Sequence, residues 1–103
     1  MRYVRRMIVV PAKDVDKVNT DLENAGWGPT NLSIPLEKGN KVESYVCDMA
    51  ISIDMLRTLD KLGVKDVVEV KKEPGKHRLD VLAANRGCKV GTKRLKKPHD
   101  PKP

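Results

Sequence analysis

The amino-acid sequence predicts an α+β fold in which two helices cover one face of a four-stranded antiparallel sheet. Two stretches carry apolar residues at the three- and four-residue spacing of amphipathic helices. Four others have the alternation or the β-branched and aromatic content of strands. Their order along the chain is βαββαβ, and right-handed crossovers turn this order into the ferredoxin-like split βαβ arrangement. A swapped dimer of the same unit and a mixed sheet are the alternatives.

The first strand and the first helix occupy the N-terminal quarter of the chain. Residues 2–10 are rich in β-branched and aromatic side chains, and both parities are apolar toward the end, as in a central strand. Asp14 is expected to be the N-cap of the helix that follows. One face of this helix carries Val15, Val18, Leu22 and Ala25. Gly26 then supplies the left-handed residue that ends many helices.

A β-hairpin is predicted next. Residues 31–36 alternate between apolar and polar side chains, and Pro35 indicates an edge strand because it cannot donate a backbone hydrogen bond. Residues 37–40 contain Gly39 and Asn40, which favour a tight turn. Residues 41–49 then form the third strand.

The second helix and the fourth strand complete the predicted domain. Ser52 is a good N-cap residue, and Gly63 ends the helix. Between them lies an apolar stripe of Met55, Leu56, Leu59 and Leu62. Residues 66–72, with Val68 and Val70 on one parity, are expected to form the fourth strand.

The surplus of positive charge lies in the last third of the chain. The 103 residues have a formal net charge of +7, but residues 1–72 carry 12 Lys and Arg against 11 Asp and Glu. Residues 73–103 carry 9 against 3. The sequence therefore predicts an α+β domain over residues 1–72 and an extended, basic, Pro-containing C-terminal arm over residues 73–103. Residues 78–85 could form a short strand or a helical turn, whereas residues 86–103 are expected to be ordered only by a partner.

Composition restricts the class of protein. No apolar run approaches the roughly 18 residues of a membrane span, and the apolar segment near the N-terminus is too short for a secretory signal. Membrane association is therefore not expected, and the protein is expected to be intracellular. Cys47 and Cys88 form no disulfide framework and are expected to be reduced thiols.

Two groups of residues are candidates for contact with a partner. The arm offers Arg86, Lys89, Lys93, Arg94, Lys96 and Lys97. Such cations neutralise phosphates or lie on acidic protein surfaces. The second group is expected on the sheet face opposite the helices and comprises Tyr3, Arg5, Tyr45 and Lys71. Tyrosines at such places can stack on nucleic-acid bases, but they also shield open sheets or lie in subunit interfaces.

The sequence does not suggest an enzyme, a cofactor or a metal centre. Residues 1–72 contain no histidine, so a nucleophile–histidine pair would have to borrow one from the arm. The possible metal ligands are His77, Cys88, His99 and Asp100, which lack the short paired spacing of a zinc site.

Several motifs within residues 8–52 carry a resemblance. They are Val-Pro-Ala at residues 10–12, Asn19 in the middle of a helix, Gly-Pro-x-Asn-x-Ser-x-Pro-Leu at residues 28–36 and Tyr-x-Cys at residues 45–47. In these residues the chain resembles a group of small uncharacterised proteins encoded by bacteriophages and prophages. The resemblance implies a phage protein, such as a virion accessory component, located in the host cytoplasm or the virion. It covers under half of the chain and carries over no functional residue.

The expected function is that of a non-enzymatic virion accessory or assembly protein. Its small domain would dock on neighbouring protein subunits, copies of itself included, and its basic arm would run along a partner surface. The alternative is a small nucleic-acid-binding or regulatory protein that uses the basic arm and the sheet tyrosines.

Overall fold

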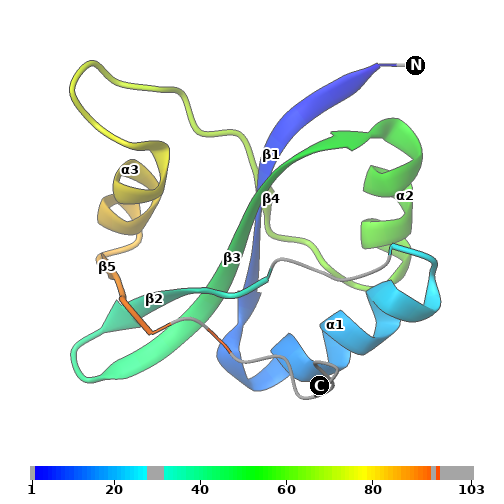
Figure 1. The fold of residues 1–103 in the computed structure, drawn as a ribbon, viewed down its shortest axis with the longest axis horizontal. Coiled ribbons are helices and arrows are strands. Elements are labelled where there is room, and N and C mark those ends of the chain that lie inside the picture. Colours follow the sequence, from blue (N-terminus) through cyan, green and yellow to red (C-terminus); the bar gives the residue numbers. More distant parts are fainter. Residues whose placement is uncertain (1, 28–31, 94, 96–103) are drawn as a thin grey trace, which may run out of the picture.

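The computed structural model describes residues 2–27, 32–93 and 95, which form a five-stranded antiparallel sheet with three α-helices (Figure 1). The strand order is β4-β1-β3-β2-β5. The strands are β1 (Tyr3–Pro11), β2 (Ile34–Lys38), β3 (Lys41–Ser52), β4 (Val67–Val68) and β5 (Lys89–Val90). The helices are the short 3-10 helix η1 (Ala12–Asp14), α1 (Val15–Asn24), α2 (Ile53–Lys61) and α3 (Arg78–Asn85). The α+β class is confirmed, but the expected number of four strands is wrong because β5 adds a fifth.

Strand β1 lies inside the sheet, as its apolar composition predicts. It pairs with β3 in an unbroken register from Tyr3 opposite Ser52 to Pro11 opposite Ser44. On its other side it pairs with β4. All four residues from Met7 to Val10 are buried, so both faces of the sheet need a cover.

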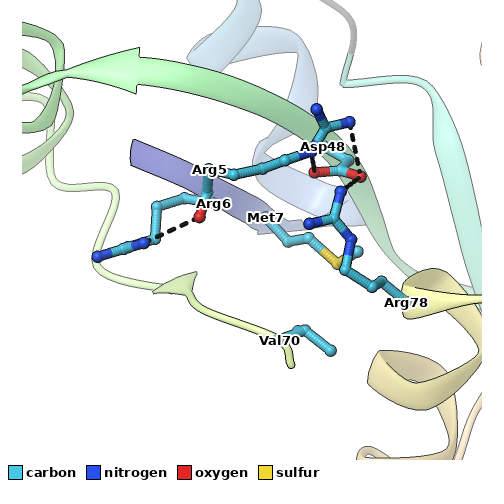
Figure 2. Close-up of a pocket in the computed structure, with 6 residues that line it drawn as sticks. All are labelled: Arg5, Arg6, Met7, Asp48, Val70 and Arg78. Carbon is cyan, nitrogen blue, oxygen red and sulfur yellow. Dashed lines mark hydrogen bonds and ion pairs between the residues drawn. The ribbon is translucent and has the colours of Figure 1, made fainter. Parts of the chain in front are cut away.

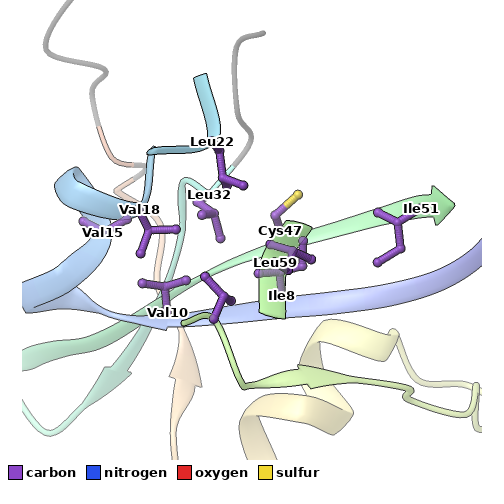
Figure 3. Packing of buried hydrophobic residues seen from close by; sticks show 10 residues of the cluster. Ile8, Val10, Val15, Val18, Leu22, Leu32, Cys47, Ile51 and Leu59 are labelled. Carbon is purple, nitrogen blue, oxygen red and sulfur yellow. The ribbon is translucent and has the colours of Figure 1, made fainter. Parts of the chain in front are cut away.

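Helices α1 and α2 cover one face of the sheet (Figure 1). The buried residues of this layer, here called the α1–α2 core, are Ile8, Val10, Val15, Val18, Leu22, Leu32, Cys47, Ile51, Leu59 and Val64 (Figure 3). Leu22 and Leu59 are almost completely buried, and Leu56 packs against the same cluster from the side. The helical periodicity of the sequence therefore identified most of the residues that face the sheet, but Ala25, which was expected on the same face, is exposed at the C-cap of α1.

Helix α3 packs on the opposite face of the sheet, which the sequence left open (Figure 1). The buried residues of this layer, here called the α3 core, are Met7, Val9, Leu36, Val46, Leu82, Ala83 and Cys88. Residues 78–85 are thus helical, one of the two forms expected for them. The expectation that residues 73–103 form an extended arm was wrong for this part of the chain, because α3 and Cys88 supply the apolar cover that Met7 and Val9 require.

Of the two predicted N-cap residues, one caps its helix with its side chain and the other does not. The Ser52 hydroxyl accepts a hydrogen bond from the backbone N–H of Met55 at 3.2 Å, which confirms Ser52 as the N-cap of α2. Asp14 stands at the N-cap of α1, but its side chain makes no capping bond. Its φ of −105° and ψ of −4° are not the extended values that capping requires, because η1 leads directly into α1.

The predicted hairpin is present, but its first strand, β2, is not at the edge of the sheet as expected. Lys38 pairs with Lys41 across a two-residue turn in which Gly39 has a φ of +63°. Strand β2 lies between β3 and β5, with Leu36 opposite Val90. Proline lacks a backbone donor but keeps its acceptor, and the carbonyl of Pro35 accepts a hydrogen bond from Gly91 N–H at 2.9 Å. At the opposite edge, β4 is limited to two residues where a strand of seven was expected.

Candidate functional site

The two sheet tyrosines lie on opposite faces of the sheet, which corrects the expectation that they share one. Tyr45 is opposite Val10 in the register and packs against the α1–α2 core. Tyr3 is seven positions before Val10, so it points to the α3 side, where 56% of it is exposed. The side of Tyr45 was assigned wrongly because both the odd-numbered and the even-numbered positions of β3 carry apolar residues. Alternation along the strand then does not reveal which set faces the helices. The pair cannot form a single base-stacking platform.

The two basic residues expected beside the tyrosines are also separated. Arg5 shares the α3-side face with Tyr3, since both have odd positions in β1. Lys71 is exposed in the segment that connects β4 to α3. The structure thus brings together only Tyr3 and Arg5 of these four candidates on one strand face.

A group of three charged residues, here called the Asp48 cluster, was not anticipated (Figure 2). It consists of Asp48 on β3, Arg5 on β1 and Arg78 at the start of α3. Arg5 donates from Nε to Oδ1 at 3.2 Å and from Nη2 to Oδ2 at 3.4 Å. Arg78 Nη2 donates to Oδ2 at 2.8 Å. Both carboxylate oxygens are therefore engaged by guanidinium groups.

The Asp48 cluster joins three segments that are distant in the sequence. The side chain of Asp48 is 19% exposed, and those of Arg78 and Arg5 are 26% and 56% exposed. A carboxylate with so little exposure needs cationic or hydrogen-bonding partners, and here they fasten α3 to the two central strands. Its signal in the sequence is an acidic residue, Asp48, between the apolar residues Val46, Cys47, Met49 and Ala50 of a central strand, where a carboxylate needs a cationic partner.

Next to the Asp48 cluster, a solvent-open hollow of about 300 Å³ separates α3 from the segment that follows β4. Its lining residues are Asp48, Lys72, His77, Arg78 and Leu79. Arg6 lines a smaller neighbouring depression, and its guanidinium group points away from Asp48 and donates to the backbone carbonyl of Arg5 (Figure 2). Its Nη1 lies 3.8 Å from Oε2 of Glu69. The hollow therefore presents more cationic than anionic groups to solvent.

The candidate residues of the arm divide into three kinds. Arg86 is used internally, since its Nη2 donates to Oδ1 of Asp66 at 2.5 Å. Lys89 and Lys93 are exposed, and neither forms an ion pair with a described acidic residue. The remaining candidates, Arg94, Lys96 and Lys97, lie outside the described residues.

The root of the arm is attached to the folded domain. The backbone N–H of Leu95 donates to the carbonyl of Ser33 at 3.0 Å, and its side chain packs against the α1–α2 core. The chain thus passes from β5, beside the α3 layer, to the layer of α1 and α2. Residue 95 fixes the point from which the last eight residues begin.

The possible metal ligands do not come together in the part of the chain that the structure describes. His77 is an exposed residue at the N-cap of α3, and Cys88 is buried in the α3 core. Within residues 2–27, 32–93 and 95, no group of three or more ligand-type side chains could hold a metal ion. His99 and Asp100 lie outside these ranges. Cys47 and Cys88 are on opposite sides of the sheet and are not joined by a disulfide.

Comparison with protein-family models, with curated proteins and with solved structures finds no match to this chain. Among the described residues, none of the helices combines the length and the apolar character needed to cross a bilayer. Function must therefore be inferred from the geometry and charge of the described side chains.

Proposed function

We propose that this protein is a non-enzymatic phage assembly protein, a virion accessory component whose small domain docks on neighbouring subunits. Its basic arm lies along an acidic partner surface. The observation that carries the proposal is the attached root of the arm, with Leu95 held on Ser33 and with Lys89 and Lys93 exposed nearby. Lys89 and Lys93 are thereby presented to solvent near a defined point on the domain.

The attached root lowers the cost of ordering the arm on a partner. Ordering the backbone of a flexible segment costs about 1–2 kcal/mol per residue. Residues up to Lys93 and Leu95 already have their places on the domain, so a partner that contacts them does not have to order them. Residues 94–103 contain Arg94, Lys96, Lys97 and Lys102 against one acidic residue, Asp100. An acidic surface is the complementary partner, and its attraction for these cations weakens as salt screens it.

We infer further that residues 3–68 form a ferredoxin-like split βαβ unit. The antiparallel order β4-β1-β3-β2 and the placement of α1 and α2 on one face support this inference. Helix α3 and strand β5 are then additions that close the second face and lengthen the sheet at β2. With both faces covered, the outer surfaces of the helices and the arm are available to neighbouring subunits.

The phage context is tested with particles purified from an induced lysogen that encodes the chain. Quantitative mass spectrometry should find the protein at a fixed copy number relative to the major capsid protein. A matched lysogen with the reading frame interrupted provides the control for contamination. Absence from the particles would reject the virion role. Salt-sensitive binding of the purified chain to DNA or RNA would then favour the nucleic-acid-binding alternative.

The role of the arm is tested by adding purified protein back to particles that lack it. A chain ending at Leu95 and the double variant Lys89→Gln/Lys93→Gln should each bind at least about tenfold more weakly than the full chain. The matched control is Lys13→Gln/Lys61→Gln, which removes the same charge from exposed positions elsewhere. Undiminished binding of both arm variants would show that the arm contributes only to solubility.

A further inference from the structure

We propose that the hollow beside the Asp48 cluster is a binding site for a phosphate group. This site lies between α3 and the segment that follows β4, and it is separate from the arm. Its permanent positive charges come from Lys72 and Arg78 on the lining and from Arg5 at the neighbouring depression. The proposal does not depend on the assembly role of the protein.

The charges at the hollow are not balanced. Asp48 is the one carboxylate on the lining, and both of its oxygens already accept hydrogen bonds from Arg5 and Arg78. Lys72 forms no ion pair with a described acidic residue and is exposed. Two guanidinium groups and one ammonium group therefore face a single, occupied carboxylate, so the site attracts anions and repels metal cations.

The guanidinium groups retain donors for a ligand. Each has five N–H groups, of which the contacts with Asp48 use one on Arg78 and two on Arg5. Asp48 also restricts the conformations of both side chains, so a ligand that binds them loses less entropy to their ordering. The remaining planar N–H pairs match the spacing of phosphate oxygens.

The size and lining of the hollow favour a small, strongly charged group. Its volume of about 300 Å³ is at the lower end of the range of about 300–1,000 Å³ for small-molecule sites. Leu79 is the one apolar residue among the lining residues, and the other four side chains are charged or polar. A phosphate could be supplied by a small phosphorylated molecule or by the backbone of a nucleic-acid strand, and both present the same chemistry to the site.

The neighbouring lysines 71 and 72 provide a matched test. Both are exposed, but only Lys72 lines the hollow. The full chain is titrated with inorganic pyrophosphate at constant ionic strength, and binding is followed by calorimetry and by NMR shifts of Arg78 and His77. Lys72→Met should weaken binding about tenfold, the loss expected for one charge-assisted contact. Lys71→Met, which removes the same charge next door, should change it by less than about twofold.

The source of the phosphate is distinguished by a second probe, a ten-residue thymidine oligonucleotide without terminal phosphates. Saturable pyrophosphate binding that depends on Lys72 supports a small phosphorylated ligand. Binding of the oligonucleotide alone, with the same dependence on Lys72, supports a nucleic-acid backbone. In either case a chain ending at Leu95 should bind as tightly as the full chain, because the arm is not involved.

Two results would overturn the proposal. One is the absence of saturation by either probe up to about 10 mM, since any specific site should bind more tightly than that. The other is an equal loss of binding in Lys71→Met and Lys72→Met, which would mean that only the general positive charge of the surface attracts the probes.

Discussion

Replacing Leu82 by alanine should destabilise the protein as strongly as a substitution in the α1–α2 core. Leu82 is 4% exposed and packs with Met7 and Val9 on the α3 side of the sheet. Truncating a buried leucine removes its transfer free energy and leaves a cavity, at a cost of about 2–5 kcal/mol. Leu59→Ala on the other face should cost a similar amount. In a domain of this size, even 2 kcal/mol lowers the melting temperature by at least about 8 °C.

The assay is guanidinium unfolding followed by far-UV circular dichroism and by the fluorescence of Trp27, the only tryptophan. Trp27 packs against the α1–α2 core, whereas Leu82 lies on the other side of the sheet. Coincident transitions by circular dichroism and by Trp27 fluorescence would therefore show that the two layers unfold together. Asn85→Ala, at an exposed position of α3, should change stability by less than about 0.5 kcal/mol. A Leu82→Ala protein as stable as this control would refute the packing of α3 on the sheet.

Three further predictions concern local interactions. The hydrogen bond and the charge of Asp21 raise the pKa of Lys17 above its ordinary value of 10.5. NMR titration should show this raised pKa in the parent chain and its loss in Asp21→Asn. The ion pair should contribute to stability at neutral pH, and this contribution should disappear as the pH rises through the raised pKa of Lys17. A double-mutant cycle of Arg86→Ala and Asp66→Ala should give a coupling energy of about 0.5–1 kcal/mol, because the pair is partly exposed; zero coupling would contradict the contact. Gly39→Ala should cost about 1–2 kcal/mol in thermal unfolding, since the turn requires a φ of +63°, and an unchanged melting temperature would argue against that turn.

The features predictable from the sequence were those set by neighbours along the chain. The apolar spacing of α1 and α2, the Ser52 cap and the Gly39 turn each depend on residues within one helix or one turn. Each of these features is caused by residues close together in the sequence, and each is present in the structure. The Asp14 cap failed because a preceding 3-10 turn changed its backbone conformation.

The features that could not be predicted depend on contacts between distant segments. Strand β5 has two residues, too few for any periodicity, and exists because β2 offers it an unpaired edge. The face of Tyr45 was undetermined because both faces of β3 are apolar. The Asp48 cluster joins residues 43 and 30 positions apart, so neither guanidinium could be assigned to this carboxylate from the sequence.

The order in which the two layers appear during synthesis follows from the position of α3 in the chain. All the buried residues of the α1–α2 core have been synthesised once β4 has left the ribosome, although Leu95 is added to this layer later. The late residues that bury Met7 and Val9 come from residues 79–90. A nascent chain that has reached Lys72 therefore carries a largely formed sheet with one apolar side uncovered. Exposed apolar sheet surface is prone to aggregation and to chaperone binding. Premature termination between Lys72 and Val90 would release a fragment whose sheet has one apolar side exposed, because residues 79–90 supply the cover for that side.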